Sequence, residues 1–405
     1  MESGRVIAVL MRLTRDVGLA EDLAQEALLA ALGQWPQSGV PDNPGAWLTA
    51  TAKRRAIDLF RRNAVAERKH QDLARDLTAL EQTVPDLDSN LDDPIGDDLL
   101  RLVFISCHPI LSTESRVALT LRLLGGLTTP EIARAFLTPE PTIAQRIVRA
   151  KRILAEKQIS FEVPRGRELA ARLSSVLEVI YLIFNEGYSA TAGDDLIRPT
   201  LCEDALRLGR ILAELTPNEP EVHGLVALME IQASRTRARV SPTGEPILLL
   251  EQDRAHWDLL LIHRGLTAID RAHKIGKPRG PYLLQAEIAA CHARARTPEE
   301  TDWRRIVSLY TELVHVAPSP VIELNRAVAV SMVHGPQAAL DLVEALANDP
   351  SLEGYHRLPS VRADLLLKLD RPTEARRYFE QAAALTQNIR ERALLLSRAA
   401  ACQTK

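Results

Sequence analysis

One spacing pattern recurs in the second half of the chain and restricts the fold more than any other feature. Small or apolar residues stand four and then three residues apart, and in the first two occurrences a proline follows five residues later. The occurrences are Ala205-Gly209-Leu212-Pro217, Ile306-Tyr310-Leu313-Pro318, Ala339-Val343-Leu346 and Ala375-Phe379-Ala382. Because residues three and four apart share one face of an α-helix, each occurrence predicts an amphipathic helix.

A second helix precedes the last two occurrences, since Ala327 and Ala363 stand twelve residues before the start of each. The resulting helix–turn–helix unit of about 34 residues resembles a degenerate tetratricopeptide repeat (TPR). One unit cannot bury its own apolar stripe, so neighbouring units stack into a solenoid. The sequence therefore predicts a TPR-like helical solenoid over residues 167–405. An arginine-rich insertion at Ser234–Gln252 interrupts the repeats and is expected to form an exposed loop.

Composition agrees with a protein built from helices alone. Aromatic residues make up only 4% of the chain, and runs of β-branched or aromatic residues with strand alternation are nearly absent. The predicted fold class is all-α.

Charge is strongly segregated although the net charge is only −3. Residues 53–69 hold seven basic and two acidic residues, residues 72–98 hold nine acidic and one basic, and residues 134–157 hold six basic and two acidic. This arrangement indicates two polyanion-binding helices joined by an acidic tether. Ordinary solvated helix faces would give the same pattern, so charge alone leaves both interpretations open.

Several classes of function are disfavoured. The 4 cysteines are scattered without a CxxC pair, which fits free thiols in a reducing cytosol better than disulfides or zinc. No apolar run approaches the ~20 residues of a membrane span, so a cytoplasmic protein is expected. Phosphate loops and hydrolase motifs are absent; Glu186, with Asp194 and Asp195 beside Arg198, is better explained by a structural ion pair and a helix cap. The sequence thus predicts no enzyme, no catalytic residues, no metal and no cofactor.

The chain divides into four segments in this interpretation. Residues 1–70 form a compact helical unit, 71–98 an acidic linker, and 99–160 a second small helical unit. After a break at Val163–Gly166, the solenoid occupies residues 167–405.

The second unit contains a candidate helix-turn-helix at Leu127–Leu154. Thr129 can cap a first helix that starts at Pro130, and the chain turns at Leu137–Pro139 before a second helix begins near Glu140. The second helix has an apolar face and a polar face. They consist of Ile143, Ile147, Ala150 and Leu154, and of Thr142, Gln145, Arg146 and Arg149, respectively.

Such a helix suits the DNA major groove. Gln and Arg make paired hydrogen bonds to base edges, and basic side chains contact phosphates. An ordinary αα-hairpin with a basic solvent-exposed face has the same spacing and is not excluded by it.

The first unit combines an acidic helix, a loop and a basic helix. Residues 16–32 predict a helix with a buried stripe of Leu23, Ala24, Ala27, Leu28 and Ala31 and an opposite face of Asp22, Gln25, Glu26 and Leu29. That face is either a protein-docking surface or simply exposed to solvent. A loop over Gln34–Gly45 follows, and then a basic helix over Ala46–Asn63.

Together these motifs resemble regions 2 and 4 of the sigma-70 family, specifically its extracytoplasmic-function (ECF) group. Three stretches carry the resemblance: AEDLAQEALLAAL, AWLTATAKRRAIDLFRR, and PEIARAF followed by TIAQRIVRAKRIL. The segment Tyr181–Leu208 resembles an ECF subgroup with a long TPR-like C-terminal extension. The chain begins almost inside the first sigma helix, so the leading turns usual in the family are expected to be short or missing.

The resemblance implies a sigma factor that binds core RNA polymerase and directs it to promoter DNA. Asp22, Gln25 and Glu26 match the helix that docks on the β′ clamp, and a further contact with the β flap is implied. The positions that match the −10-binding surface are Asn43, Trp47, Lys53, Arg54, Arg55, Arg61 and Arg62. The positions that match the −35-reading helix are Thr142, Gln145, Arg146 and Arg149.

The resemblance also implies roles for the remaining segments. The acidic linker would follow the basic RNA-exit channel of the polymerase. The solenoid is expected to regulate the sigma part and to bind a protein or a ligand.

Two other functions remain open at this point. A free-standing helix-turn-helix regulator with a sensory solenoid would explain the second unit, but it leaves the acidic helix and the loop without a role. A scaffold whose repeat array is the active part is the third. Transcription assays with core polymerase separate the sigma factor from both.

Overall fold

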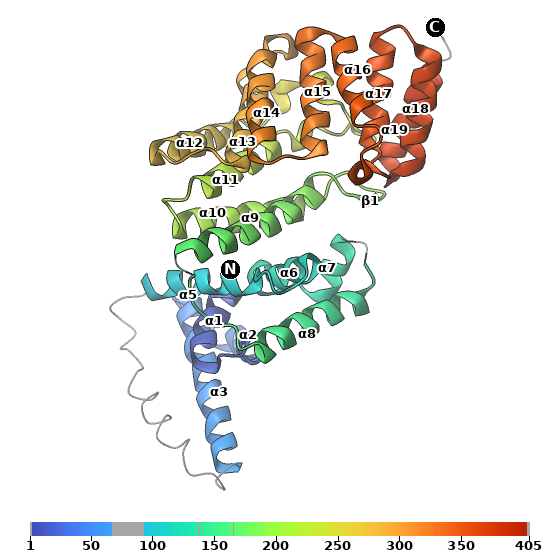
Figure 1. The fold of residues 1–405 in the computed structure, drawn as a ribbon. Coiled ribbons are helices and arrows are strands. Elements are labelled where there is room, and N and C mark those ends of the chain that lie inside the picture. Colours follow the sequence, from blue (N-terminus) through green and yellow to red (C-terminus); the bar gives the residue numbers. More distant parts are fainter. Residues whose placement is uncertain (1, 67–92, 137, 165, 403–405) are drawn as a thin grey trace. The chain divides into compact units, whose positions relative to one another are not determined.

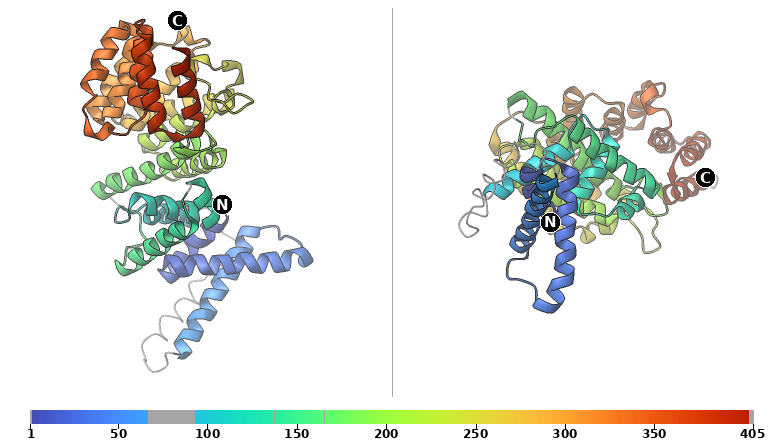
Figure 2. Two further views of the ribbon diagram at one scale, coloured as in Figure 1. Left: turned by 90° about the vertical axis from the view of Figure 1, so that its right-hand side faces the viewer. Right: turned by 90° about the horizontal axis from the view of Figure 1, so that it is seen from below.

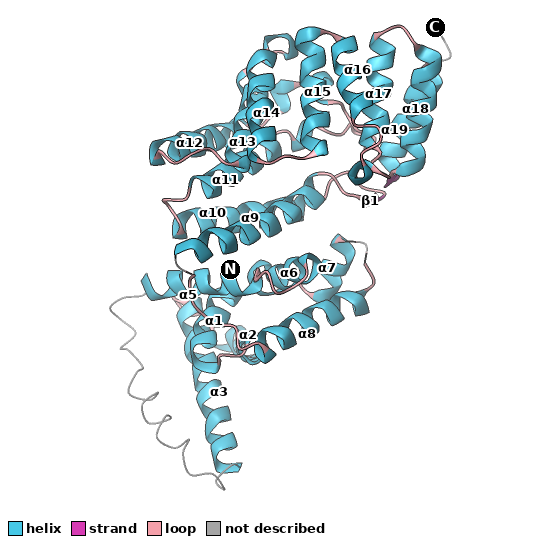
Figure 3. Cartoon of the chain, in the orientation of Figure 1, coloured by secondary structure: helices cyan, strands magenta, loops and turns pink. Residues whose placement is uncertain are grey.

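The computed structural model describes residues 2–66, 93–136, 138–164 and 166–402, which are almost entirely helical (Figure 3). Two compact units divide the chain, Met1–Val179 and Ile180–Lys405. Of the predicted acidic linker, residues 71–92 lie outside the described part of the chain. Within the described residues, no helix has the length and apolarity needed to cross a bilayer.

The first unit is a bundle of helices drawn from the two sequence regions that flank the predicted linker (Figure 1). Its elements are α1 (Glu2–Thr14), α2 (Val17–Ser38), α3 (Pro44–Ala66), α5 (Asp93–Ser106), α6 (Thr113–Thr120), the π-helical turn η1 (Leu121–Gly125), α7 (Thr129–Ala135), α8 (Glu140–Glu156) and the first half of α9 (Gly166–Tyr188).

Helix α1 lies at the centre of this unit, packed against α2, α3 and α5. Its apolar stripe, which includes Ile7, Leu10 and Met11, is at most 2% exposed. Phe104 on α5 is fully buried. Residues on both sides of the predicted linker therefore contribute to one shared core. Burial of each such side chain contributes ~1.5–3 kcal/mol to its stability.

The first half of α9 belongs to this unit and not to the repeats. Arg172 donates a hydrogen bond to the carbonyl of Phe104 (2.9 Å), and the Ser175 hydroxyl donates to the carbonyl of Cys107 (2.7 Å). Arg116 on α6 forms an ion pair with Glu178 (3.0 Å). These contacts agree with a division between Val179 and Ile180, so the second unit begins thirteen residues after the predicted start at 167. Apolar spacing cannot reveal which neighbour a helix packs against.

The second unit is an array of helices with short strands and 3-10 turns between them. After the second half of α9 come β1 (Ala192–Gly193), α10 (Pro199–Leu215), α11 (Pro220–Ala233), η2 (Thr236–Ala238), η3 (Leu249–Glu251), η4 (Arg254–His256), α12 (Leu259–Ile275), α13 (Pro281–Arg294), η5 (Pro298–Glu300), α14 (Trp303–Val316), α15 (Pro320–His334), α16 (Pro336–Ala345), η6 (Pro350–Leu352), α17 (Arg357–Lys368), α18 (Pro372–Leu385), β2 (Gln387–Asn388) and α19 (Ile389–Ala401).

The repeat pattern seen in the sequence accounts for this array. Each helix from α10 to α19 packs against the next one in the chain (Figures 1 and 2). The first residue of each motif is buried: Ala205, Ala339 and Ala375 are 0% exposed and Ile306 is 1% exposed. Many of these helices begin at a proline, whose missing N–H costs nothing in the first turn. The prediction of an all-α protein with a TPR-like solenoid is confirmed.

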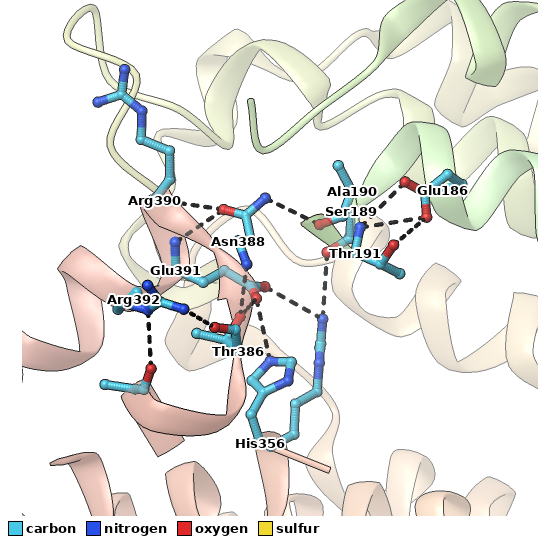
Figure 4. Close-up of polar contacts among 12 residues, drawn as sticks. Glu186, Ser189, Ala190, Thr191, His356, Thr386, Asn388, Arg390, Glu391 and Arg392 are labelled. Atoms are coloured by element: carbon cyan, nitrogen blue, oxygen red, sulfur yellow. Dashed lines mark hydrogen bonds and ion pairs between the residues drawn. The ribbon is translucent and has the colours of Figure 1, made fainter. Parts of the chain in front are cut away.

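The two ends of the array are joined (Figure 4). Strands β1 and β2 pair in parallel, with Ala192 opposite Gln387 and Gly193 opposite Asn388. The fully buried Asn388 amide donates hydrogen bonds to the carbonyls of Ala190 (3.1 Å) and Asp195 (3.0 Å). The first and last helices of the array are therefore held together.

Glu186 and Arg198 form an ion pair, in line with the structural interpretation of these residues. Glu186 also accepts a hydrogen bond from the Thr191 hydroxyl (3.0 Å; Figure 4). Asp194 and Asp195 are exposed.

The insertion at Ser234–Gln252 is exposed only in part, most of all between Pro242 and Glu251. Arg235, Ala238 and Gln252 are 8%, 5% and 7% exposed, respectively, whereas Arg237 is exposed. The prediction of an exposed loop was wrong in part, because the arginine side chains pack against aromatic rings from distant helices, which local polarity cannot show.

Candidate DNA and polymerase interface

The candidate recognition helix α8 has the two faces that its spacing predicted. Ile143, Ile147, Ala150 and Leu154 are buried against α6 and α7. On the polar face, Gln145 and Arg149 are exposed, while Thr142 and Arg146 are half-buried.

The neighbour of Arg146 is Glu114, at the start of α6. The pKa of Glu114 is lowered by hydrogen bonds at this helix start and, to a smaller extent, by the charge of Arg146. Arg146 thus interacts electrostatically with Glu114 of the protein itself. Gln145 and Arg149 are therefore the polar side chains of this face that are most open to a ligand.

The first helix of the motif begins one residue earlier than expected. Thr128, and not Thr129, is the capping residue: its hydroxyl accepts the Glu131 N–H (3.4 Å), and the Glu131 carboxylate accepts the Thr128 N–H (2.7 Å). This reciprocal pair is a capping box. Leu137, at the predicted turn, lies outside the described residues.

The acidic face of α2 combines charge with exposed apolar surface. Asp22 and Glu26 are exposed, and Glu26 forms an ion pair with Arg55 on α3 (2.7 Å). Leu29 and Leu32 are 67% and 72% exposed on the same helix. Exposed leucines beside carboxylates are more typical of a protein-docking surface than of a solvated helix face.

Part of the predicted loop at Gln34–Gly45 is helical. Helix α2 continues to Ser38 with Pro36 inside it, so only residues 39–43 connect α2 to α3. The predicted start of the loop at Gln34 was therefore wrong by five residues. The ring of Trp35 packs edge-on against Trp47 (5.5 Å between centroids), which stabilises this last turn.

The predicted −10 residues do not all share one open surface. The Asn43 side chain accepts the Ala46 N–H (3.0 Å) and so caps α3. Arg54, Arg61 and Arg62 are exposed, whereas Arg55 is half-buried and paired with Glu26.

Lys53 differs from the other cations of α3. It is half-buried, and burial lowers its pKa, as does the nearby charge of Arg12, while Asp98 raises it. Asp98 is 1% exposed and pairs with Arg12 (3.5 Å). Lys53 therefore lies where α1, α3 and α5 meet, and is less available to DNA than its sequence position predicts.

The most connected carboxylate of this unit, Glu21, was not identified from the sequence. Its side chain is 5% exposed, accepts hydrogen bonds from the Arg122 Nε–H (2.6 Å) and the Gln25 amide (2.8 Å), and forms an ion pair with the Lys151 ammonium (2.6 Å). Lys151 belongs to α8 and Arg122 to η1, so Glu21 connects the acidic helix directly to the recognition-helix module. A signal was present, because Glu21 stands three and seven residues before Ala24 and Leu28 of the predicted buried stripe.

Comparison with known families matches three parts of the chain. Residues 2–65 match the family model for sigma-70 region 2, and residues 101–154 match that for sigma-70 region 4. Residues 172–273 match a family of unknown function, DUF6596.

Whole-chain comparison finds relatives of two kinds. An uncharacterized protein of Rhizobium meliloti, R00370, is 43% identical over 396 residues, which cover 96% of this chain and 92% of that protein. The ECF RNA polymerase sigma factor SigK of Mycobacterium ulcerans is 30% identical over 154 residues, which cover 35% of this chain and 74% of SigK.

Among solved structures, yeast Tom70 aligns with 97% of this chain and 83% of its own length, at 12% identity and a TM-score of 0.33. The two sigma-70 family models cover helices α1–α3 and α5–α8 in the main. The chain belongs to the ECF group of the sigma-70 family of RNA polymerase sigma factors, and carries a helical-repeat extension after region 4.

Proposed function

We propose that this sigma factor gives RNA polymerase its promoter specificity by three contacts made from the first unit. Helix α2 docks on the β′ clamp, α3 with the segment before it binds the melted −10 element, and α8 reads the −35 element as duplex while its module contacts the β flap. The proposal rests on one observation. The residues that match sigma-70 regions 2 and 4 form helices whose charged side chains are exposed. A free-standing regulator is not favoured, because it needs no region 2.

The polymerase contact is supported by the chemistry of the α2 surface. Asp22, Leu29 and Leu32 are exposed there without a described partner that covers them. Apolar anchors next to carboxylates give both affinity and orientation at a protein interface.

The −10 contact is supported by the cations of α3. Arg54, Arg61 and Arg62 are exposed along the helix, and this spacing suits phosphates of a single strand. The Trp35–Trp47 pair, at the start of α3, offers aromatic surface on which an unstacked base can pack.

The −35 contact is supported by Gln145 and Arg149. Both side chains are exposed on α8, and both residue types can form paired hydrogen bonds with a base edge. Thr142 and Arg146 flank them and would complete the contact through the backbone or a phosphate.

The free chain holds its two DNA-binding modules too close together for a promoter. The straight-line distance between Thr142 and Asn43 cannot exceed the length of a path through the protein. That path runs along α8 to Lys151, across its ion pair to Glu21 on α2, along α2 to Glu26, across the ion pair to Arg55, and back along α3 to Asn43. The helical stretches amount to about 39 Å at ~1.5 Å per residue. Two crossings between neighbouring helices, at ~8–10 Å each, bring the path to about 60 Å. Elements centred at −10 and −35 lie ~25 base pairs apart, which is about 85 Å of duplex.

Promoter binding by both modules therefore requires the contact at Glu21 to open. The covalent chain from Ala66 to Asp93 is long enough to allow this, because an extended chain spans ~3.3–3.6 Å per residue. Docking of α2 on polymerase, next to Glu21, would supply the free energy for opening. The closed arrangement would then make promoter binding depend on the core enzyme.

The repeat array is proposed to regulate the first unit. Helix α9 is continuous from the contacts with α5 and α6 into the array, so a change in the array has a covalent and helical path to the region 4 module.

A gel-shift assay with and without core polymerase tests the proposed function. We expect the full-length chain alone to bind promoter DNA weakly and to lose that binding steeply as salt rises, because few contacts beyond phosphates are made. With core polymerase added, a promoter-specific complex should form, and a fragment with a scrambled −35 element should not form it. Tight sequence-specific binding by the chain alone would contradict the proposal and favour a free-standing regulator.

A further inference from the structure

Arg235, in the segment after α11, is a buried cation whose charge is not balanced. Its side chain is 8% exposed, and its Nε is fully covered without a hydrogen-bond acceptor. Within the described residues, no carboxylate lies within ion-pair distance of its guanidinium group. A buried charge without a partner is unfavourable, and buried charges in native proteins are usually paired.

Two aromatic rings flank this guanidinium. Its central carbon lies 6.0 Å from the ring centroid of Tyr188 and 5.9 Å from that of Trp257. Cation–π attraction at this distance is weaker than the loss of hydration of a buried guanidinium. The rings therefore shape the site without neutralising it.

The neighbouring arginines add positive charge but have neutral acceptors. Arg239 lies over the Tyr188 ring (3.6 Å to the centroid) and donates a hydrogen bond to the Tyr188 carbonyl. Arg254 donates to the carbonyls of His292 and Ala295 (2.6 Å each). The carboxylates of Glu299 and Glu300 act electrostatically on Arg254.

Two titratable groups that interact electrostatically with Arg235, Tyr310 and His292, carry no negative charge. Burial raises the pKa of Tyr310, on α14, to about 12, so its phenol stays neutral. Burial, with the charges of Arg235 and Arg254, lowers the pKa of His292 to about 4. Neither Tyr310 on α14 nor His292 on α13 therefore offsets the positive charge of Arg235.

We propose that the repeat array binds an oxyanion, a carboxylate or a phosphate, at Arg235, with Tyr188 and Trp257 packed against the apolar part of the molecule that bears it. A guanidinium presents parallel N–H groups that match two oxygens of such an anion. The ligand would provide the acceptor that Arg235 lacks, and the rings would favour a flat or apolar body next to the anionic group. Arg235 and the two rings thus indicate a class of ligand for the array, whereas the repeat pattern alone indicates none.

Calorimetric titration of the full-length chain with inorganic phosphate and, separately, with benzoate tests the proposal. The proteins compared are the wild type, Arg235→Gln and the matched control Arg237→Gln, which removes an exposed arginine two residues away. Ionic strength is kept constant with NaCl so that general screening is the same in every titration. The two anions distinguish a phosphoryl ligand from an aromatic carboxylate.

We expect saturable binding of at least one anion by the wild type and by R237Q, and at least tenfold weaker binding by R235Q. In anion-free buffer, R235Q should have a Tm equal to or above that of the wild type, because it loses an unbalanced buried charge. A purely structural arginine would give the opposite: a lower Tm for R235Q and the same anion binding in all three proteins. That result, or the absence of saturable binding by the wild type, would overturn the proposal.

A second substitution keeps the test valid if R235Q does not fold. Arg235→Lys keeps the charge but loses the parallel N–H pair, so we expect a folded protein that binds the same anion several-fold more weakly. Wild-type affinity in R235K would overturn the assignment of the guanidinium as the binding group.

Discussion

Replacing Arg149 with alanine should reduce transcription from a cognate promoter by about 10–100-fold, because a paired hydrogen bond to a base contributes ~1–3 kcal/mol of discrimination. Arg149 is exposed on α8, opposite the face that Ile147 and Ala150 bury, so its loss should not disturb packing. Run-off transcription at constant salt measures the effect, on the cognate promoter and on variants with each −35 base pair changed. The variant should also discriminate less at one of those base pairs.

The matched control is Lys157→Ala, which removes one exposed positive charge just after the end of α8. Loss of a charge that contacts only phosphates should weaken DNA binding slightly, and to the same extent on every DNA sequence. If R149A and K157A have the same modest effect on every promoter variant, α8 does not read the −35 element through Arg149.

Replacing Glu21 with glutamine should open the first unit and strengthen binding to core polymerase by at least tenfold. Glutamine leaves Arg122 and Lys151, each with a side chain only 21% exposed, without their shared carboxylate. Breaking a buried pair in this way costs ~3–5 kcal/mol. Since docking of α2 on polymerase is proposed to favour the open form, the apparent affinity for core polymerase should rise as the closed form becomes less stable.

Small-angle scattering of the free full-length chain and a titration with core polymerase measure the two consequences. The control is Glu156→Gln, whose side chain is 63% exposed and pairs with Arg152 on the same helix. An exposed pair contributes ~0–1 kcal/mol, so this variant should match the wild type. Equal radius of gyration and equal polymerase affinity for E21Q and E156Q would contradict an opening step at Glu21.

A double substitution separates opening from simple loss of stability. Lys151→Met in the E21Q background removes a cation that the single substitution leaves unpaired, so the double variant should regain part of the lost stability. It should still be open and still bind polymerase tightly. A double variant that returns to the closed form would place the contact elsewhere.

The recognition helix and the repeats could be predicted from sequence because both depend on local helical periodicity. The buried faces of α8 and of α10, α14, α16 and α18 follow directly from spacings of three and four residues. Periodicity also explains the small errors at the ends of elements. Thr128 and Thr129 are both good caps, and only the Glu131 side chain decides between them.

The features that could not be predicted depend on contacts between distant residues. Glu21 and Arg122 are 101 residues apart, and no local pattern relates them. Pro36 remains inside α2 because Trp47 packs on the turn that contains it. Arg235 looked like part of a solvated loop, since its partners Tyr188 and Trp257 come from other parts of the array.

The most direct test of the account is run-off transcription by core RNA polymerase on the DNA upstream of the gene for this chain, with and without the full-length protein. If the chain acts as a sigma factor, a transcript with one defined start should appear only when chain and core enzyme are both present. It should disappear when the −10 or −35 sequence is scrambled. A chain that is folded by circular dichroism, yet neither comigrates with core polymerase nor produces that transcript, would contradict the account.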